Sequence, residues 1–383
     1  MNTQALYDFT PVLRLMAMGL VIALGPLAWI WMRHQGASPG RRLQALTLLT
    51  LFLTFDLVLF GAFTRLTDSG LGCPDWPGCY GKASPVGART EIAAAQDAMP
   101  SGPVTHRKAW IEMIHRYLAT GVGVLILALA LASWLNWRRG GASLGVSPWW
   151  PTFTLVWVCV QGAFGALTVT MKLFPAIVTL HLLGGLGLLA LLCVQAERQR
   201  QSAAGGAGVA VLSPALRLGL WLTAALVVLQ VALGGWVSTN YAVLACSEFP
   251  RCQGSWWPEM RFSQGFEIWR TLGHTGAGTP IEFAALTAIH YTHRLVAYAV
   301  LVALGLLAWR LSHAGVLTVQ ARWLATLAVW QLVSGLSNVV LGWPLVAALA
   351  HTGGAAGLVV VLAWALAASR VATDARFVSR ATA

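Results

Sequence analysis

The sequence predicts an all-α polytopic membrane protein, built from two parallel four-helix-bundle repeats plus one extra N-terminal transmembrane helix, with nine spans in all. Three observations predict this fold. Of the 383 residues, 57% are hydrophobic and only 10% are charged, whereas soluble domains carry about 25% charge. Nine runs are long and apolar enough to cross a bilayer, and residues of the first half recur in the second half. This composition excludes a soluble enzyme, a disordered chain and a nucleic-acid binder.

The apolar runs give the expected spans directly, because each contains roughly 20 predominantly apolar residues. The first run resembles a signal peptide, but no small-residue cleavage site precedes Arg33, so we expect a retained helix. The expected spans are 11–32, 44–65, 110–135, 150–171, 175–195, 216–238, 284–309, 322–342 and 344–369.

The distribution of charge predicts the orientation. Arginines gather in one set of short loops and in the C-terminal tail, whereas the long loops 66–109 and 239–283 hold most of the acidic residues. The positive-inside rule therefore places the N-terminus outside and the C-terminus in the cytoplasm. The net charge of +12 then needs no partner beyond anionic lipid. Because no Arg-rich amphipathic presequence is present, we expect a bacterial cytoplasmic (inner) membrane.

An internal duplication organises the chain. Cys73 and Cys79 recur at an offset of 173, as Cys246 and Cys252. Four helices per repeat is an even number, so both repeats enter the membrane in the same orientation. The predicted parts are an extra helix with its cytoplasmic loop at 1–43, an N-terminal repeat at 44–200, a cytoplasmic linker at 201–215, a C-terminal repeat at 216–370 and a cytoplasmic tail at 371–383.

Four histidines are the candidate ligands of a buried group. His115, His181, His293 and His351 each follow the outer start of an expected span, at a depth of roughly 8 to 14 Å. A single intramembrane histidine is usually a packing residue, but two per repeat at one depth suit haem iron between opposed helices. We expect His115 to pair with His181 and His293 with His351. Zinc or di-iron would need clustered cysteines or carboxylates, and the absence of C-x-x-C-H excludes covalent attachment.

Three arginines are candidate partners of haem propionates. Arg116 and Arg294 directly follow two of these histidines, and Arg65 lies at the outer end of its span. Charge-assisted pairing would offset the desolvation of both arginine and propionate. For Arg65, snorkelling to the interface is an equally good interpretation.

The two repeats differ at one acidic position. Glu112 precedes His115 by three residues and therefore lies on the same helix face, whereas His290 precedes His293. A carboxylate there could act as a base or stabilise positive charge on a substrate, or it could simply be a structural partner of Arg116. The catalytic interpretation makes the N-terminal half the reactive site and the C-terminal half an electron-transfer site. Asp56 has no counterpart, and no role is assigned to it.

The cysteines in the long loops predict two disulfides, Cys73–Cys79 and Cys246–Cys252, because both pairs face an oxidising compartment. We expect them to be structural, and a redox role for the first pair stays open. Cys159 and Cys193 lie within spans and are expected to be reduced and buried.

These motifs resemble one known family. The runs GAFTRLTDSGL at 61–71, WIEMIHR at 110–116 and THR at 292–294, with His181 and His351, are similar to haem A synthase over about residues 44–369. The resemblance implies oxidation of the C8 methyl of haem O to a formyl group by successive hydroxylations. It also implies that haem O binds near His115 and His181 with Glu112 catalytic, and that a haem b cofactor is held by His293 and His351.

The resemblance further suggests haem O synthase and cytochrome oxidase assembly factors as partners, and a homo-oligomer stays open. Two alternatives share part of the pattern. A di-haem b subunit linked to quinol would use all four histidines but would not need Glu112. A solute transporter built on parallel repeats would bind no haem.

Overall fold

The structure is a computed structural model that describes residues 10–139, 146–205 and 208–371. Its first half contains α1 (Thr10–Arg33), α2 (Pro39–Leu66), α3 (Arg89–Ala98), α4 (His106–Arg138), α5 (Trp149–Thr170) and α6 (Pro175–Ala203). Its second half contains β1 (Ala210–Leu212), α7 (Pro214–Thr239), the 3₁₀ helix η1 (Ala242–Leu244), α8 (Phe262–Gly265), α9 (Phe283–His313), α10 (Thr318–Val340), α11 (Leu345–Ala367) and β2 (Ser369–Val371). Within the described residues, nine helices are long and apolar enough to cross a membrane. The predicted all-α polytopic fold and its nine spans are confirmed.

Several helices extend beyond the apolar runs that predict them. The helix α2 begins at Pro39 because Ser38 caps it, accepting a 3.4 Å hydrogen bond from the amide of Arg41. Ser213 and Pro214 start α7 in the same way. At its far end α6 continues to Ala203, past the predicted linker boundary. Polar helix ends can protrude from the hydrocarbon, so the apolar window underestimates helix length.

A short parallel strand pair was not expected in an all-α fold. β1 pairs with β2, with Ala210 opposite Ser369 and Leu212 opposite Val371. The pair joins the predicted linker to the end of the second repeat. Three-residue strands leave no periodic signal in a sequence, which is why they were missed. Residues 206–207 of the linker and 372–383 of the predicted tail lie outside the described residues.

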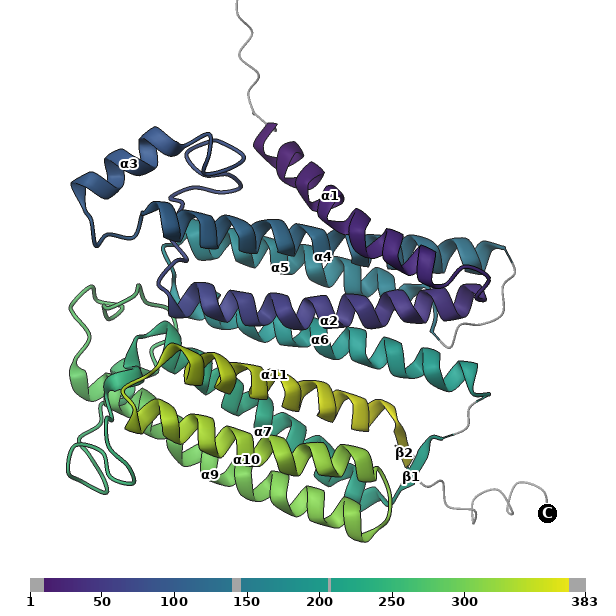
Figure 1. Cartoon of the computed structure of the whole chain (residues 1–383). Coiled ribbons are helices and arrows are strands. Elements are labelled where there is room, and N and C mark those ends of the chain that lie inside the picture. Colours follow the sequence, from purple (N-terminus) through teal and green to yellow (C-terminus); the bar gives the residue numbers. More distant parts are fainter. Residues whose placement is uncertain (1–9, 140–145, 206–207, 372–383) are drawn as a thin grey trace, which may run out of the picture.

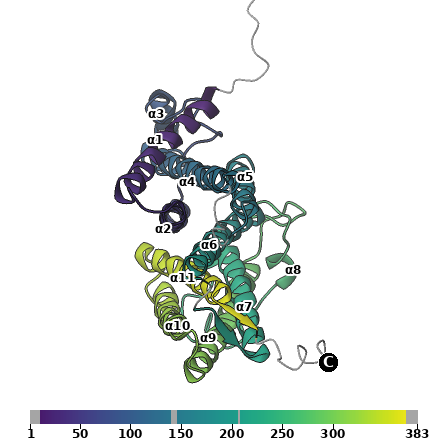
Figure 2. The same cartoon turned by 90° about the vertical axis from the view of Figure 1, so that its right-hand side faces the viewer.

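The long helices form two closed rings of four. In the first ring α2, α4, α5 and α6 each pack against two neighbours, so that α4 lies across from α6. In the second ring α7, α9, α10 and α11 do the same, so that α9 lies across from α11. Figure 1 shows the two rings as upper and lower groups of roughly parallel cylinders, and Figure 2 shows them end-on. The rings touch through α2, α6, α7 and α11. The repeat arrangement remains a prediction that these contacts support.

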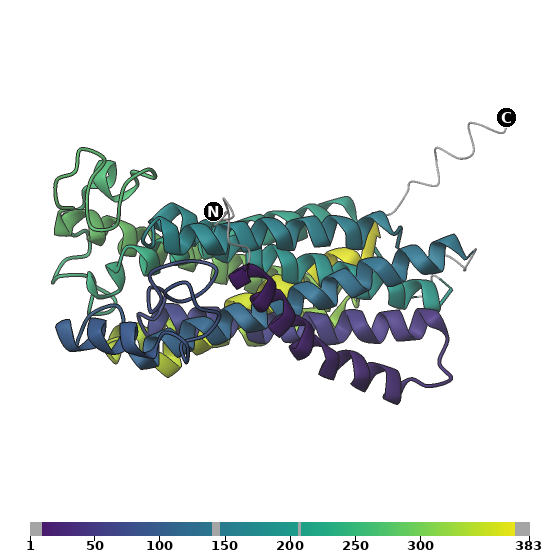
Figure 3. The ribbon, with the colours of Figure 1, turned by 90° about the horizontal axis from the view of Figure 1, so that it is seen from above.

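The extra helix α1 lies outside both rings. It crosses the surface of α4 obliquely, as Figure 3 shows, and packs mainly against that helix. The close approach depends on glycine, because the Cβ of a residue at Gly19 would collide with Thr120, and one at Gly121 would lie 3.0 Å from Ile22. Near its outer end, Leu15 joins a buried cluster with Met113 of α4. The helix therefore covers the α4 segment that carries Glu112.

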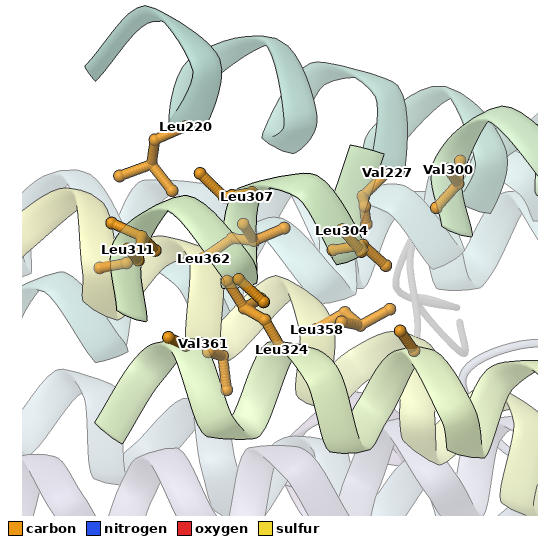
Figure 4. Close-up of a cluster of buried hydrophobic side chains, with 14 of the residues drawn as sticks. Leu220, Val227, Val300, Leu304, Leu307, Leu311, Leu324, Leu358, Val361 and Leu362 are labelled. Carbon is orange, nitrogen blue, oxygen red and sulfur yellow. The ribbon is translucent and has the colours of Figure 1, made fainter. Parts of the chain in front are cut away.

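Apolar side chains fill the ring interiors at the end away from the long loops. Figure 4 shows this cluster in the second ring, where leucines from α7, α9, α10 and α11 interlock. A matching cluster occupies the first ring and includes Leu125 and Leu192. The two long loops gather at the opposite end of the molecule (Figures 1 and 3). The polar candidates therefore lie between a tightly packed apolar base and the loops.

Both predicted disulfides are present. Cys73–Cys79 and Cys246–Cys252 each close with a Cα–Cα distance of 4.9 Å. Cys193 is buried as expected. The expectation for Cys159 was wrong, because this residue is exposed on the outer face of α5. A span of a bundle has a face that no protein covers, and apolar composition alone does not reveal which residues occupy it.

Candidate functional site

The four candidate histidines come from the diagonal helices of the two rings. His115 on α4 faces His181 on α6, and His293 on α9 faces His351 on α11. Within each pair the imidazoles are close enough for their charges to interact. All four side chains are only partly buried. The structure therefore brings together the two pairs that the sequence analysis proposed.

Each imidazole lies against a glycine of the neighbouring helix. A Cβ added at Gly61 would lie 3.0 Å from Cε1 of His115, and one at Gly165 would lie 3.4 Å from Cε1 of His181. In the second ring a Cβ at Gly234 would lie 3.0 Å from Cε1 of His293. At Gly335 it would lie 3.1 Å from Cε1 of His351. A side chain larger than glycine would crowd the imidazoles. Glycine at these four positions therefore allows each imidazole to pack directly against the backbone of the neighbouring helix.

These residues fit a porphyrin held by two axial ligands. Among the described residues no group of three or more histidine, cysteine, aspartate or glutamate side chains could hold a bare metal ion. A pair of imidazoles supplies two ligands, which leaves four coordination positions for a macrocycle. In the first ring, the buried Nδ1 atoms of His115 and His181 have no hydrogen-bond partner among the described residues. Phe60 adds a flat apolar wall, since its ring is parallel to that of His115 at 6.2 Å.

Glu112 is buried at the loop end of α4 and is fully engaged. Its carboxylate accepts a 2.8 Å hydrogen bond from the amide of Cys73 and forms an ion pair with Arg116 one turn along the helix. Glu112 is thus a structural partner of Arg116, one of the two roles considered from the sequence. Its catalytic role remains a prediction. At the corresponding position of the second ring, His290 directs Nδ1 to the carbonyl of Ala242 at 3.0 Å. The first ring therefore has a buried carboxylate, Glu112, at the position where the second ring has a histidine, His290.

Arg116 and Arg294 hold the two disulfide loops. Arg116 donates from one nitrogen to the carbonyls of Asp75, Pro77 and Gly78, at 3.0, 3.2 and 2.6 Å. Arg294 donates to the carbonyls of Cys246, Glu248 and Arg251, at 3.2, 2.9 and 3.1 Å. Each buried guanidinium thereby satisfies carbonyls that a short loop leaves unpaired. A propionate contact of either arginine would have to compete with these bonds.

Arg65 lies where the two rings meet at the loop end. Its guanidinium bonds to the backbone carbonyl of Ser238, forms a 3.3 Å ion pair with Asp68 and stacks 4.1 Å over the ring of Tyr241. Burial raises the pKa of Tyr241, Asp68 raises it further and Arg65 opposes the shift. Arg65 thus joins the halves. Asp56 is exposed on α2 and makes no ion pair among the described residues.

Two polar residues beside the second histidine pair were missed. Ser334 lies 3.0 Å from Nδ1 of His351, and the amide of Gln230 lies 3.0 Å from Nδ1 of His293. The repeat alignment contained a signal for both, because Phe164 and Leu57 occupy the corresponding positions of the first half.

The fold and the site together define a class of protein: α-helical polytopic membrane proteins with facing pairs of intramembrane imidazoles in two bundles. Residues 44–363 match the model of the cytochrome oxidase assembly protein family. The chain therefore belongs to this family, whose curated relatives carry the name haem A synthase.

Three relatives illustrate the similarity. The haem A synthase of Shewanella oneidensis is 37% identical over 82% of this chain and 92% of its own length. That of a Methylobacterium species is 30% identical over 92% of this chain and 99% of its own length. That of Alkalihalophilus pseudofirmus is 27% identical over 78% of this chain and 88% of its own length. The predicted membership of the haem A synthase family is confirmed.

Proposed function

We propose that this protein is a haem A synthase that oxidises the C8 methyl of haem O to a formyl group. The observation that carries the proposal is the pair of facing imidazoles in each ring, each against a glycine, in a chain that is 37% identical to a haem A synthase. The first hydroxylation would convert the methyl to a hydroxymethyl group, and the second would give a geminal diol that loses water to leave the aldehyde. Each hydroxylation would insert one oxygen atom, from water or from dioxygen, into a C–H bond and would oxidise the carbon by two electrons.

The first ring is the proposed substrate site. His115 and His181 would be the axial ligands of haem O, with the apolar wall of the ring against the porphyrin face. Glu112 would act one turn before His115, as a base or by stabilising positive charge that develops on the reacting carbon. Arg116 and the amide of Cys73 hold the carboxylate in one place. A buried charge in a fixed position stabilises a transition state without having to reorganise.

The second ring is the proposed electron-transfer site. Two axial imidazoles, His293 and His351, would hold a haem b, which when bound accepts electrons one at a time. The chain's own contribution is to fix those imidazoles and to keep the loop above them closed through Arg294. The rings share the α6–α11 contact, so the sites would lie side by side in the membrane.

The arginines would serve the propionates to different degrees. Arg65 is the strongest candidate, because it lies at the loop end between the rings and is only partly buried. Arg116 and Arg294 would contribute mainly by holding the loops, with propionate binding as a second role.

The environment and partners complete the proposal. Nine apolar helices and bacterial relatives place the chain in a bacterial inner membrane as a multi-pass protein. We propose that its N-terminus lies outside and its C-terminus in the cytoplasm. Haem O would come from a haem O synthase, and cytochrome oxidase assembly factors would receive the product.

The test is to extract the pigments of the purified protein and to resolve haem B, haem O and haem A after incubation in cells that supply haem O. A haem A synthase is expected to yield haem B with haem O or haem A. A di-haem electron conduit would yield haem B alone, and a transporter would be colourless. Either of these outcomes would overturn the proposal.

A further inference from the structure

The four candidate ligands differ in what contacts their Nδ1 atom. Ser334 on α10 donates its hydroxyl proton to the carbonyl of Trp330 at 2.7 Å and lies 3.0 Å from Nδ1 of His351. Because the hydroxyl proton is already used, the oxygen is available to accept the Nδ1–H of His351. This contact selects the tautomer whose Nε2 lone pair is free for a metal.

His293 has a polar neighbour of a different kind in Gln230 on α7. The amide nitrogen of Gln230 lies 3.0 Å from Nδ1 of His293 and donates to the backbone carbonyl of His293, also at 3.0 Å. Turning the amide would place its oxygen against that carbonyl oxygen, so the nitrogen stays on this side as a donor. Gln230 therefore does not accept the Nδ1–H of His293 in the way that Ser334 can accept that of His351.

The first ring has neither device. Leu57 takes the place of Gln230 and Phe164 takes the place of Ser334, at the repeat offsets of 173 and 170. The buried Nδ1 atoms of His115 and His181 accordingly have no hydrogen-bond partner among the described residues. The difference that matters is at the second histidine of each ring, where Ser334 lies beside His351 and Phe164 occupies the corresponding position in the first ring.

Such partners control how firmly a metal ligand binds. A hydrogen bond accepted from the second ring nitrogen fixes the ring's orientation and makes the other nitrogen a stronger donor. Removal of such a partner costs about 10- to 100-fold in metal affinity. A permanent cofactor benefits from this firmness. A substrate that must enter and leave does not, because tight ligands slow its release.

Building on the proposed function, we propose that Ser334 is a positioning residue that makes His351 a firm ligand of a resident haem. In the first ring, Phe164 offers His181 no such side-chain acceptor, so that the porphyrin bound there can exchange. The chain would thus distinguish cofactor from substrate through the residues behind the imidazoles, with identical ligands in both rings.

The test compares Ser334→Ala with Ser337→Ala in the purified, haem-loaded protein. Ser337 lies on the same helix and donates to the carbonyl four residues earlier, as Ser334 does, but it does not contact a histidine. For Ser334→Ala we expect haem B to transfer to excess apomyoglobin about 10- to 100-fold faster. We also expect a higher midpoint potential, because a weaker donor favours ferrous iron. Ser337→Ala should match the wild type in both.

A second variant tests the first ring. Phe164→Ser introduces a hydroxyl beside His181, and we expect it to slow the release of haem O from the protein.

The outcomes separate this proposal from the proposed function. If Ser334→Ala releases haem B at the wild-type rate and keeps its potential, the anchoring proposal is wrong even if haem A is made. If the wild type binds haem B and makes no haem A, the proposed function is wrong and the release rates still decide the anchoring. A protein that binds no haem overturns both.

Discussion

The hydroxyl of Tyr241 donates a 2.8 Å hydrogen bond to Asp68, a residue 173 positions earlier in the chain. The same interval separates Cys73 from Cys246 and Arg65 from Ser238, whose backbone Arg65 contacts. Residues that contact their own counterparts lie near the axis that relates two repeats. The loop-end contact between the rings therefore supports the predicted parallel duplication, which relates the halves by an axis along the membrane normal.

Tyr241→Phe removes this bond and should destabilise the protein by at most about 1 kcal/mol, because the pair is partly exposed. The raised pKa of Tyr241 means that the phenol stabilises the folded state fully below pH 10.0, its ordinary pKa. That stabilisation is lost as the pH rises through the higher pKa of the folded state. Thermal unfolding in detergent from pH 8 to 11 should show the wild type converging on the variant.

Tyr298→Phe is the matched control, since Tyr298 is about as exposed on α9. A wild type that keeps its advantage over Tyr241→Phe at pH 11 would contradict the raised pKa of Tyr241.

Glu112→Gln should lower haem A formation by roughly 10²- to 10⁴-fold while both haems stay bound. Glutamine keeps an acceptor for the amide of Cys73, so the fold is preserved better than with alanine. The measurement is the haem A yield together with the haem spectra of the purified protein. Glu112→Ala is expected to lose conversion as well, but it leaves Arg116 buried without its ion-pair partner and is the harsher test.

Glu197→Gln provides the control, because Glu197 is also buried and pairs with Arg200 at 2.7 Å, at the end of α6 far from the histidines. Full conversion by haem-loaded Glu112→Gln would leave Glu112 with a structural role alone.

Gly234→Ala should weaken retention of the resident haem. The added methyl group would lie 3.0 Å from Cε1 of His293 and displace the ring. Overpacking of this kind costs about 1–3 kcal/mol, which corresponds to roughly a 5- to 100-fold change in binding. The ratio of haem B to protein after gel filtration measures the effect.

Gly219→Ala on the same helix is the control, because its Cβ would meet no atom within 4 Å. Gly165→Ala should be mild, since its Cβ would be in ordinary contact with His181 at 3.4 Å. Equal haem retention in Gly234→Ala and Gly219→Ala would remove the support that the glycines give to the ligand assignment.

The two disulfides should differ in what their removal affects. Opening either short loop is expected to cost about 2 kcal/mol of stability. Replacing Cys73 and Cys79 by serine loosens the amide that binds Glu112, so haem A formation should fall. Replacing Cys246 and Cys252 loosens the loop held by Arg294, so retention of haem B should fall instead. Full haem A formation by a stable, haem-loaded first-pair variant would contradict this expectation.

Composition, hydropathy and duplication were enough to predict the spans and the histidine pairs. A long apolar run predicts a transmembrane helix because a segment placed in hydrocarbon must satisfy its backbone hydrogen bonds internally, and a helix does this within the segment itself. The four histidines were identifiable because intramembrane ionisable residues are rare and because the repeat showed them twice. The cysteine pairs followed from spacing and compartment, both of which can be read locally.

Packing decided the rest, because it depends on which distant segments meet. The strand pairing of Ala210 with Ser369, the exposure of Cys159 and the hydrogen bond from the amide of Cys73 to Glu112 depend on how the chain is arranged around each residue. The same holds for Ser334 behind His351, where a serine on one helix acquires a role only when a second helix brings an imidazole to it. The tendency of each span to enter hydrocarbon is a property of that stretch of chain. A directed hydrogen bond instead requires two groups within about 3 Å of each other, and only the folded chain brings them together.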